Sequence, residues 1–483
     1  MAGDEGPDDA GGRPGSDPDD FFSKIPLFGE LEKLMSWQGG PVNWDLARQV
    51  AIKAASEGDR AVSSSEQTEA RDALRLADLW LEESTALPSG MTGPTEAWSR
   101  VRWIEATLPV WRSAIDAVAE QVTAAMGSTL QEGLRGMAEG GLPPELAAML
   151  PPQIAAQLPS DASGFQALLG PMMGMLGQIG GVLFGTQVGQ ALGTLAGDVL
   201  AAGEIGLPLA PDGSMALVPL NVAAFTTDLG VPADEVRIFL ALREAAAARL
   251  FAHVPWLRSG LLGAVEEYAR GIRVDPDQIM RSVESLQASG FDPSDPNALG
   301  EAMNEGLFDV PESPEQRRAL ARLETLLALV EGWVDTVTAA AAHLRLPHTD
   351  ALRETMRRRR AAGGPAEQAF ATLVGLTMRP RKLREAAAFW EGLLIERGLD
   401  GRDALWDHPD LLPDAEQLND PTAFIKGGDG NAVSDDPIAA IEALAAAGNA
   451  GPQEMPGGQP AEPGSEPGSD GEDPDGSDGP VPA

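Results

Sequence analysis

The sequence has no cysteine in 483 residues. Disulfide bonds, thiolate metal sites and a cysteine nucleophile are therefore excluded. Histidine is almost as scarce, and no two histidines are four residues apart, so no helix can present a pair of imidazoles to one metal ion from adjacent turns. The four are His253, His343, His348 and His408.

Common nucleotide-binding and hydrolase motifs are also missing. The sequence has no P-loop and no Gly-x-Ser-x-Gly segment, and the glycines of residues 170–197 do not follow the Gly-x-Gly-x-x-Gly pattern after a strand. In proteins that have this motif, its glycines let the backbone approach a phosphate closely. The sequence therefore gives no support for a dinucleotide site or for a serine hydrolase of the nucleophile-elbow type.

Positive charge is in short supply. Lys and Arg number 35 against 73 Asp and Glu, a formal net charge of −38. Nucleic acid and anionic membranes would be repelled, so we expect a protein or peptide partner and neither of these. The first 20 residues are acidic and have no apolar h-region, which predicts no signal peptide and, with the absence of cysteine, a cytoplasmic protein.

The chain does have enough apolar sequence, 43 %, to bury a large core. Its periodicity predicts a mainly α fold, a large helical body with one small β-hairpin. The expected organisation is a disordered acidic tail over 1–20, an N-terminal helical region over 21–160, a helical core over 161–400, an irregular packed segment over 401–426 and a disordered acidic Gly/Pro/Ser-rich tail over 427–483.

Helical patterns recur along this body. Asn43 is a predicted N-cap for a helix to Ala54, and Ser313-Pro314 opens a long helix that ends near Leu344. The early tryptophans are typical of helix-packing core rather than of a ligand platform. Further helices are predicted over 65–83, 96–107, 110–130, 142–158 in two pieces, 274–289, 349–361, 365–377 and 380–397.

Two segments depart from these patterns. Residues 206–222 hold two apolar runs around Ala210-Pro-Asp-Gly213, which predicts the β-hairpin. Residues 162–197 carry no charge, and glycine recurs there every fourth residue. A membrane helix would suit that pattern. We favour a buried central helix, because glutamines interrupt the segment, no basic flank orients it, and a four-residue spacing drifts by about 40° per step and admits neighbours on several sides.

The functional interpretation depends on Pro232–Arg273. Its first half predicts one amphipathic helix, whose apolar stripe includes Val236, Phe239, Leu240 and Leu250. The same stripe carries Arg243 and Ala247. A guanidinium on a core-facing stripe needs a partner, because burying an unpaired charge is strongly unfavourable. Arg243 therefore marks a polar site inside the core.

Six segments carry a resemblance to a known family. They are GPVNWDLAR at 40–48, GQALGTLAGDVL at 189–200, IGLPL at 205–209, LREAAAARLFAHVPWLRSGLLGAVEEYARGI at 242–272, LVEGWVDTV at 329–337 and GLTMRPRKLREAAAFW at 375–390. The combination resembles the actinobacterial zincin-like family of zinc-dependent metallopeptidases, some of which are labelled as associated with coenzyme F₄₂₀ biosynthesis. The resemblance implies a zincin-like helical core and a zinc-dependent hydrolase.

The metal motif of that family is His-Glu-x-x-His, in which two histidines bind zinc and the glutamate is the general base. Here it falls on Arg243-Glu244-Ala245-Ala246-Ala247, so only Glu244 is kept. The resemblance implies Glu331 as the third ligand and Asp335 as the group that orients it. His253 lies about 15 Å further along the helix and cannot replace a ligand; it is interpreted as a packed or helix-end histidine.

We therefore expect the Arg243 guanidinium to occupy the place of the metal and to pair with Glu331, with Glu244 as a further candidate partner. In the alternative, Arg243 extends to solvent and Glu331 is an ordinary helix-edge charge.

A second candidate site is cationic. Phosphate, a nucleotide, an acidic partner or the acidic C-terminal tail could bind it. The simpler interpretation is that arginines at a helix C-terminus neutralise neighbouring carboxylates. The candidate anion patch consists of Arg357, Arg358, Arg359, Arg360, Arg379 and Arg381, with Lys382 and Arg384 close by.

These features together predict a zincin-like protein that acts as a non-catalytic binding or scaffold protein without a cofactor, with Glu244 as a remnant general base. The alternative is an active zinc-dependent hydrolase that uses Glu244, Glu331 and Asp335 with non-standard ligands. A membrane-associated binding protein is a third, less favoured interpretation.

Overall fold

The computed structural model describes residues 40–140, 180–271, 313–362, 371 and 382–426. These residues belong to one compact unit, Met1–Lys426. Both predicted tails and the helices predicted over 142–158, 274–289 and 365–377 lie outside the described residues or almost entirely so, and the predicted domain boundaries stay predictions.

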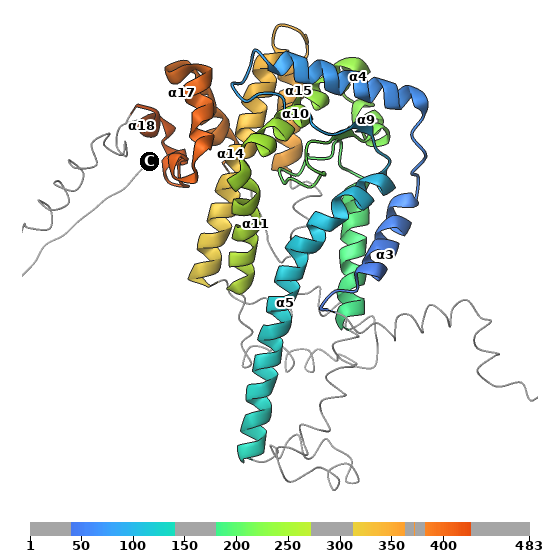
Figure 1. The fold of residues 1–483 in the computed structure, drawn as a ribbon, viewed down its shortest axis with the longest axis vertical. Coiled ribbons are helices and arrows are strands. Elements are labelled where there is room, and N and C mark those ends of the chain that lie inside the picture. Colours follow the sequence, from blue (N-terminus) through green and yellow to red (C-terminus); the bar gives the residue numbers. More distant parts are fainter. Residues whose placement is uncertain (1–39, 141–179, 272–312, 363–370, 372–381, 427–483) are drawn as a thin grey trace, which may run out of the picture. The chain divides into compact units, whose positions relative to one another are not determined.

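Helices dominate the part of the chain that the structure describes (Figure 1), so the mainly α prediction is confirmed. The α-helices are α3 (Trp44–Ser56), α4 (Ser64–Leu81), α5 (Arg100–Gly140), α9 (Pro219–Thr226), α10 (Ala233–His253), α11 (Pro255–Arg270), α14 (Pro314–Ala342), α15 (Thr349–Ala361), α17 (Leu383–Asp403) and α18 (Pro421–Lys426). The strands are β1 (Thr95–Ala97) and β2 (Met215–Leu217). Three 3₁₀ turns, η1 (Ala404–Asp407), η2 (Pro409–Leu411) and η3 (Gln417–Asn419), make up much of the segment predicted as irregular.

Side-chain caps set the predicted helix starts. Asn43 caps α3, and its side-chain oxygen accepts a hydrogen bond from the Leu46 amide at 3.0 Å. Ser313 and Gln316 form a reciprocal capping box at the start of α14. Both caps satisfy amides that have no partner within the helix, and they confirm these two predictions.

The prediction of two separate helices over 96–107 and 110–130 is wrong. Residues 95–97 form β1, and a single helix, α5, runs from Arg100 to Gly140 with Pro109 inside it. A proline removes one helical amide donor, and here the carbonyl that loses its partner belongs to Glu105, an exposed residue. Water can therefore satisfy that carbonyl, and the helix continues through the proline.

The predicted hairpin is also wrong. The turn exists, since the Ser214 amide bonds the Pro211 carbonyl at 3.0 Å and Gly213 has a positive φ of 68°. However, β2 pairs in parallel with the distant β1, and residues 206–209 form no strand. Ala201 bridges the other edge of β2 in antiparallel fashion. Sequence pattern places a turn well, but it does not reveal which distant segment takes the strand edge.

The glycine-rich helix is not central. Its described part, residues 180–196, packs against α3, while residues such as Leu183 and Thr194 are exposed. A Cβ on Gly189 would lie 2.5 Å from the Ala47 carbonyl oxygen, and one on Gly193 would lie 2.6 Å from the Ala54 methyl. The glycines therefore form one close helix–helix seam, because successive turns face the same neighbour for this length despite the drift.

The core is built around α10 and α14. Helix α10 packs against α4, α14 and β2, and α14 packs against α11 and α17. Of the described residues, only α14 is long and apolar enough to cross a membrane by length and composition, and 83 % of its apolar window is buried in the protein. Burial of that extent is what a core helix shows.

Gly189→Ala tests the glycine seam. We expect the free energy of unfolding to fall by about 1–3 kcal/mol, because the added methyl overlaps backbone that cannot move cheaply. Gly180→Ala is the matched control, since no atom lies within 4 Å of its Cβ position; it should be neutral or slightly stabilising. Urea unfolding measures both, and equal effects would contradict the seam.

Candidate functional site

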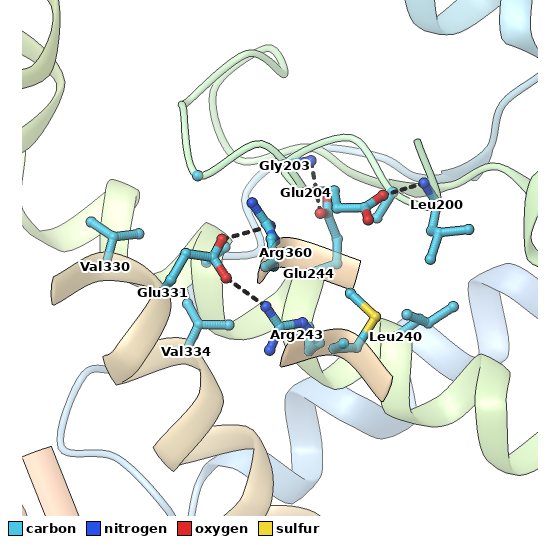
Figure 2. A pocket seen from close by; sticks show the side chains of 14 residues that line it. Leu200, Gly203, Glu204, Leu240, Arg243, Glu244, Val330, Glu331, Val334 and Arg360 are labelled. Atoms are coloured by element: carbon cyan, nitrogen blue, oxygen red, sulfur yellow. Dashed lines mark hydrogen bonds and ion pairs between the residues drawn. The ribbon is translucent and has the colours of Figure 1, made fainter. Parts of the chain in front are cut away.

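Helices α10, α14 and α15 meet the segment 200–206 around a cavity of about 20 Å³. Arg243 and Ala247 line it from α10, Glu331 from α14 and Arg360 from α15. Figure 2 shows the two arginines converging on the glutamate. The volume has room for about one water molecule, so the cavity is nearly filled by its own side chains.

Glu331 lies between two guanidiniums. Arg243 donates to Oε2 at 2.7 Å, and Arg360 donates to Oε1 at 2.7 Å (Figure 2). The side chains of Arg243 and Glu331 are only 10 % and 9 % exposed. Water screens such a pair weakly, and each carboxylate oxygen has one charge-assisted hydrogen bond. The predicted Arg243–Glu331 ion pair is therefore present, and the alternative with a solvent-directed Arg243 is wrong.

The register of α10 explains this placement. Positions 243 and 247 are one turn apart and both face the cavity, with Leu240 beside them. Ala247 contributes only a methyl group, and this leaves space that the long Arg243 side chain and Arg360 share with Glu331.

Glu244 faces the same cavity but not Arg243. Its carboxylate accepts the Gly203 amide at 2.9 Å and the Ala216 amide at 3.4 Å. Burial raises the pKa of Glu244 from 4.5 to about 7, although both amides oppose the shift and Glu204 adds to it. The expected Arg243–Glu244 contact is not found among the described contacts. Glu244 instead ties α10 to β2 and to the 200–206 segment.

Asp335, one turn after Glu331 on α14, is also held by α15. Arg353 and Arg357 each donate to its Oδ2 at 2.8 Å, and Arg353 also reaches Glu391 at 2.5 Å. The Asp335 side chain is 5 % exposed. Asp335 therefore lies one turn after Glu331, and its side-chain partners are arginines of α15.

The four arginines of the candidate patch on α15 are all paired. Arg357 binds Asp335, Arg358 binds Glu354 at 2.8 Å, and Arg360 binds Glu331. Arg359 binds the Glu204 carboxylate at 3.1 Å and the Asp198 carbonyl. These four residues are not a patch of free cations, so the simpler interpretation describes them correctly. Arg379 and Arg381 lie outside the described residues.

The histidines take no part in the site. His253 is the exposed last residue of α10, as predicted for a helix-end histidine. His348 contacts Glu235 at 3.0 Å, and His408 caps the short η2 turn. His343 follows the end of α14. Within the described ranges, no group of three His, Asp or Glu side chains is arranged to hold a metal ion.

Sequence reasoning missed Glu204 and Arg353. The Glu204 carboxylate lines the cavity, accepts the Leu200 amide and binds Arg359. Its signal was available, because it is the only charge between Asp198 and Asp212. Arg353 is one turn before Arg357 and shares its helix face. A helical reading of the arginine run would have grouped it with Arg357 and Arg360.

Arg249 was missed as well. It is fully buried on α10, where Nε donates to Asp78 at 3.0 Å and Nη2 bonds Glu82 at 2.7 Å. These contacts attach α10 to α4. The preceding run of four alanines, 245–248, indicates a helix covered on several sides, and that signal could have predicted a buried arginine.

The sequence model of a family described as zincin-like metallopeptidase matches residues 42–425. Curated protein sequences give no match. Among solved structures, the chain is similar to a proposed hydrolase with a novel fold from Chloroflexus aurantiacus, with a TM-score of 0.52, 18 % identity, and coverage of 80 % of this chain and 99 % of that one. At that identity the likeness concerns the fold alone.

Glu244→Gln tests the protonation of the buried glutamate. The folded protein keeps a proton on Glu244 up to about pH 7, while the unfolded chain releases it near pH 4.5. The folded state binds more protons in this window, so wild-type unfolding free energy falls as pH rises through it. We expect the unfolding free energy of the variant minus that of the wild type to increase by on the order of 3 kcal/mol as pH rises through this window. Above the window the difference should stay constant.

Urea unfolding across this pH range measures the effect. Glu266→Gln, at an exposed position of α11, is the matched control and should show no such growth. A constant difference between Glu244→Gln and wild type would mean that Glu244 is ionised in the folded protein at low pH.

Proposed function

Because the chain belongs to the zincin-like metallopeptidase family, we propose that it is a non-catalytic member, a cytoplasmic binding or scaffold protein that needs no zinc. The observation that carries this proposal is the Arg243–Glu331–Arg360 arrangement. It supplies positive charge where a relative with the full motif would hold a metal ion between two imidazoles and a carboxylate.

The residues present do not fit zinc. A zinc site needs three or four donor atoms at about 2.0–2.3 Å, and positions 243 and 247 offer none. Both oxygens of Glu331 are bound to guanidiniums, and those of Glu244 face backbone amides. A dication beside Arg243 and Arg360 would also be repelled.

The cavity supports the same proposal. Metal-assisted peptide hydrolysis needs space for the metal, a water molecule and the scissile carbonyl. About 20 Å³ leaves room for about one water molecule. Glu244 keeps the pKa of a general base, but its carboxylate holds the Gly203 and Ala216 amides. In this chain the remnant base has a structural task, the attachment of β2 to α10.

Zinc content decides between this proposal and an active hydrolase. We expect protein purified without a histidine tag to carry fewer than about 0.1 zinc ions per chain, and calorimetric titration to show no tight site. The variant Arg243→His with Ala247→His removes one guanidinium and adds two imidazoles. It should bind zinc at least about 100-fold more tightly than wild type.

Arg243→His alone is the matched control, because it supplies only one of the two imidazoles and should gain little affinity. One tightly held zinc ion per wild-type chain would overturn the proposal. So would zinc-dependent peptide hydrolysis by the wild type that Glu244→Gln abolishes, since this substitution removes the base without touching positions 243, 247 or 331.

A further inference from the structure

A larger depression lies at the opposite edge of the small sheet. The Glu244 cavity adjoins the edge of β2 at which the Ala216 amide faces Glu244 and Ala201 bridges Leu217. β1 covers the other edge of β2. Beyond β1 lies a groove of about 470 Å³, lined on one side by Gln67, Arg71 and Arg75 of α4 and on the other by the extended segment 91–96.

β1 presents a backbone edge to this groove. The Pro94 carbonyl accepts the Met215 amide at 3.1 Å, and the Trp98 amide donates to Leu217 at 2.8 Å, so alternate residues of this segment bond β2. The residues between them, Thr95 and Ala97, direct their amides and carbonyls the other way. The Ala97 amide is held by Gln67 Oε1 at 3.2 Å. Thr95 lines the groove beside the arginines, although the residue as a whole is only 9 % exposed.

Arg71 and Arg75 differ from the arginines of the Glu331 cavity. They lie one turn apart on α4 and both line the groove. Among the residues that the structure describes, neither has a carboxylate within salt-bridge distance, although the chain carries 73 Asp and Glu. Two guanidiniums that line a groove without a carboxylate partner favour a ligand that brings its own carboxylates.

We propose that this groove binds an extended, acidic peptide segment of a partner protein, with carboxylates at alternating positions. Successive turns of α4 place Arg71 and Arg75 about 6 Å apart along the helix axis. Alternate side chains on one face of a strand repeat every 6.6 Å or so. A peptide that lies extended along the groove would therefore bring two i, i+2 carboxylates opposite the two guanidiniums.

The groove does not fit a polyanion such as nucleic acid. Glu96 lines the same groove, and its carboxylate accepts the Trp98 indole N–H at 2.7 Å. A continuous phosphate chain would meet that carboxylate and the net charge of −38. Discrete carboxylates on an extended peptide can reach the two arginines and leave Glu96 opposite a neutral position. The proposal does not depend on whether the Glu331 cavity holds a metal ion.

Fluorescence polarisation with a labelled, acetylated Asp-Ala-Asp-Ala-Asp peptide tests this site on the full chain. At about 0.15 M salt the Debye length is about 8 Å, so distant acidic residues are screened while direct contacts persist. Saturable binding is expected below about 1 mM, and Arg71→Glu with Arg75→Glu should weaken it at least about tenfold. The same peptide with Asn in place of Asp should not bind.

Arg270→Glu with Arg317→Glu is the matched control. It makes the same change of charge at two exposed positions outside the groove and should leave the affinity within about twofold. If circular dichroism shows that the reversed-charge variant does not fold, the peptide affinity of Arg71→Gln with Arg75→Gln is measured in its place. Absent binding to the wild type, equal binding by the Gln variant, or equal binding of the Asn peptide would each overturn the proposal.

Discussion

The structure around the cavity depends on the ion pairs between the Glu331 carboxylate and two guanidiniums. Arg243 comes from α10 and Arg360 from α15, so one buried anion joins three helices. Removing water from any of these charges is unfavourable unless the others are present. The three side chains are therefore interdependent. Two guanidiniums also carry more charge than the one carboxylate between them, so the arrangement has a net positive charge.

Helix α15 depends on the same charges. Only Thr349, Leu352 and Met356 of its 13 residues are buried, while four of its arginines reach carboxylates on α14, α17 and the 200–206 segment. Leu352 and Met356 anchor one face of the helix in the core, and the ion pairs hold its arginine face over the cavity. The α15 arginines of the candidate anion patch thus form ion pairs with carboxylates around the cavity.

The sequence predicted what local patterns determine. The stripe of α10 identified Arg243 as buried and paired, and caps at Asn43 and Ser313 identified helix starts. The sequence did not predict which distant segments pair with each other. β2 selected β1, more than 100 residues earlier, as its partner, and no local signal encodes that pairing. The Arg360 contact was hidden for the same reason, since four successive arginines look alike until the fold decides which one faces Glu331.

A double-mutant cycle on Arg243 and Glu331 tests the central claim most directly. Arg243→Met, Glu331→Gln and the double variant would be compared by urea unfolding, with Arg360 unchanged. Glu331→Gln leaves the buried Arg243 without a charged partner, and Arg243→Met leaves Glu331 with Arg360 alone. If the two charges depend on each other, the coupling free energy should therefore be at least about 1.5 kcal/mol. Additive effects, within about 0.3–0.5 kcal/mol, would show that the two charges do not depend on each other and would contradict the account.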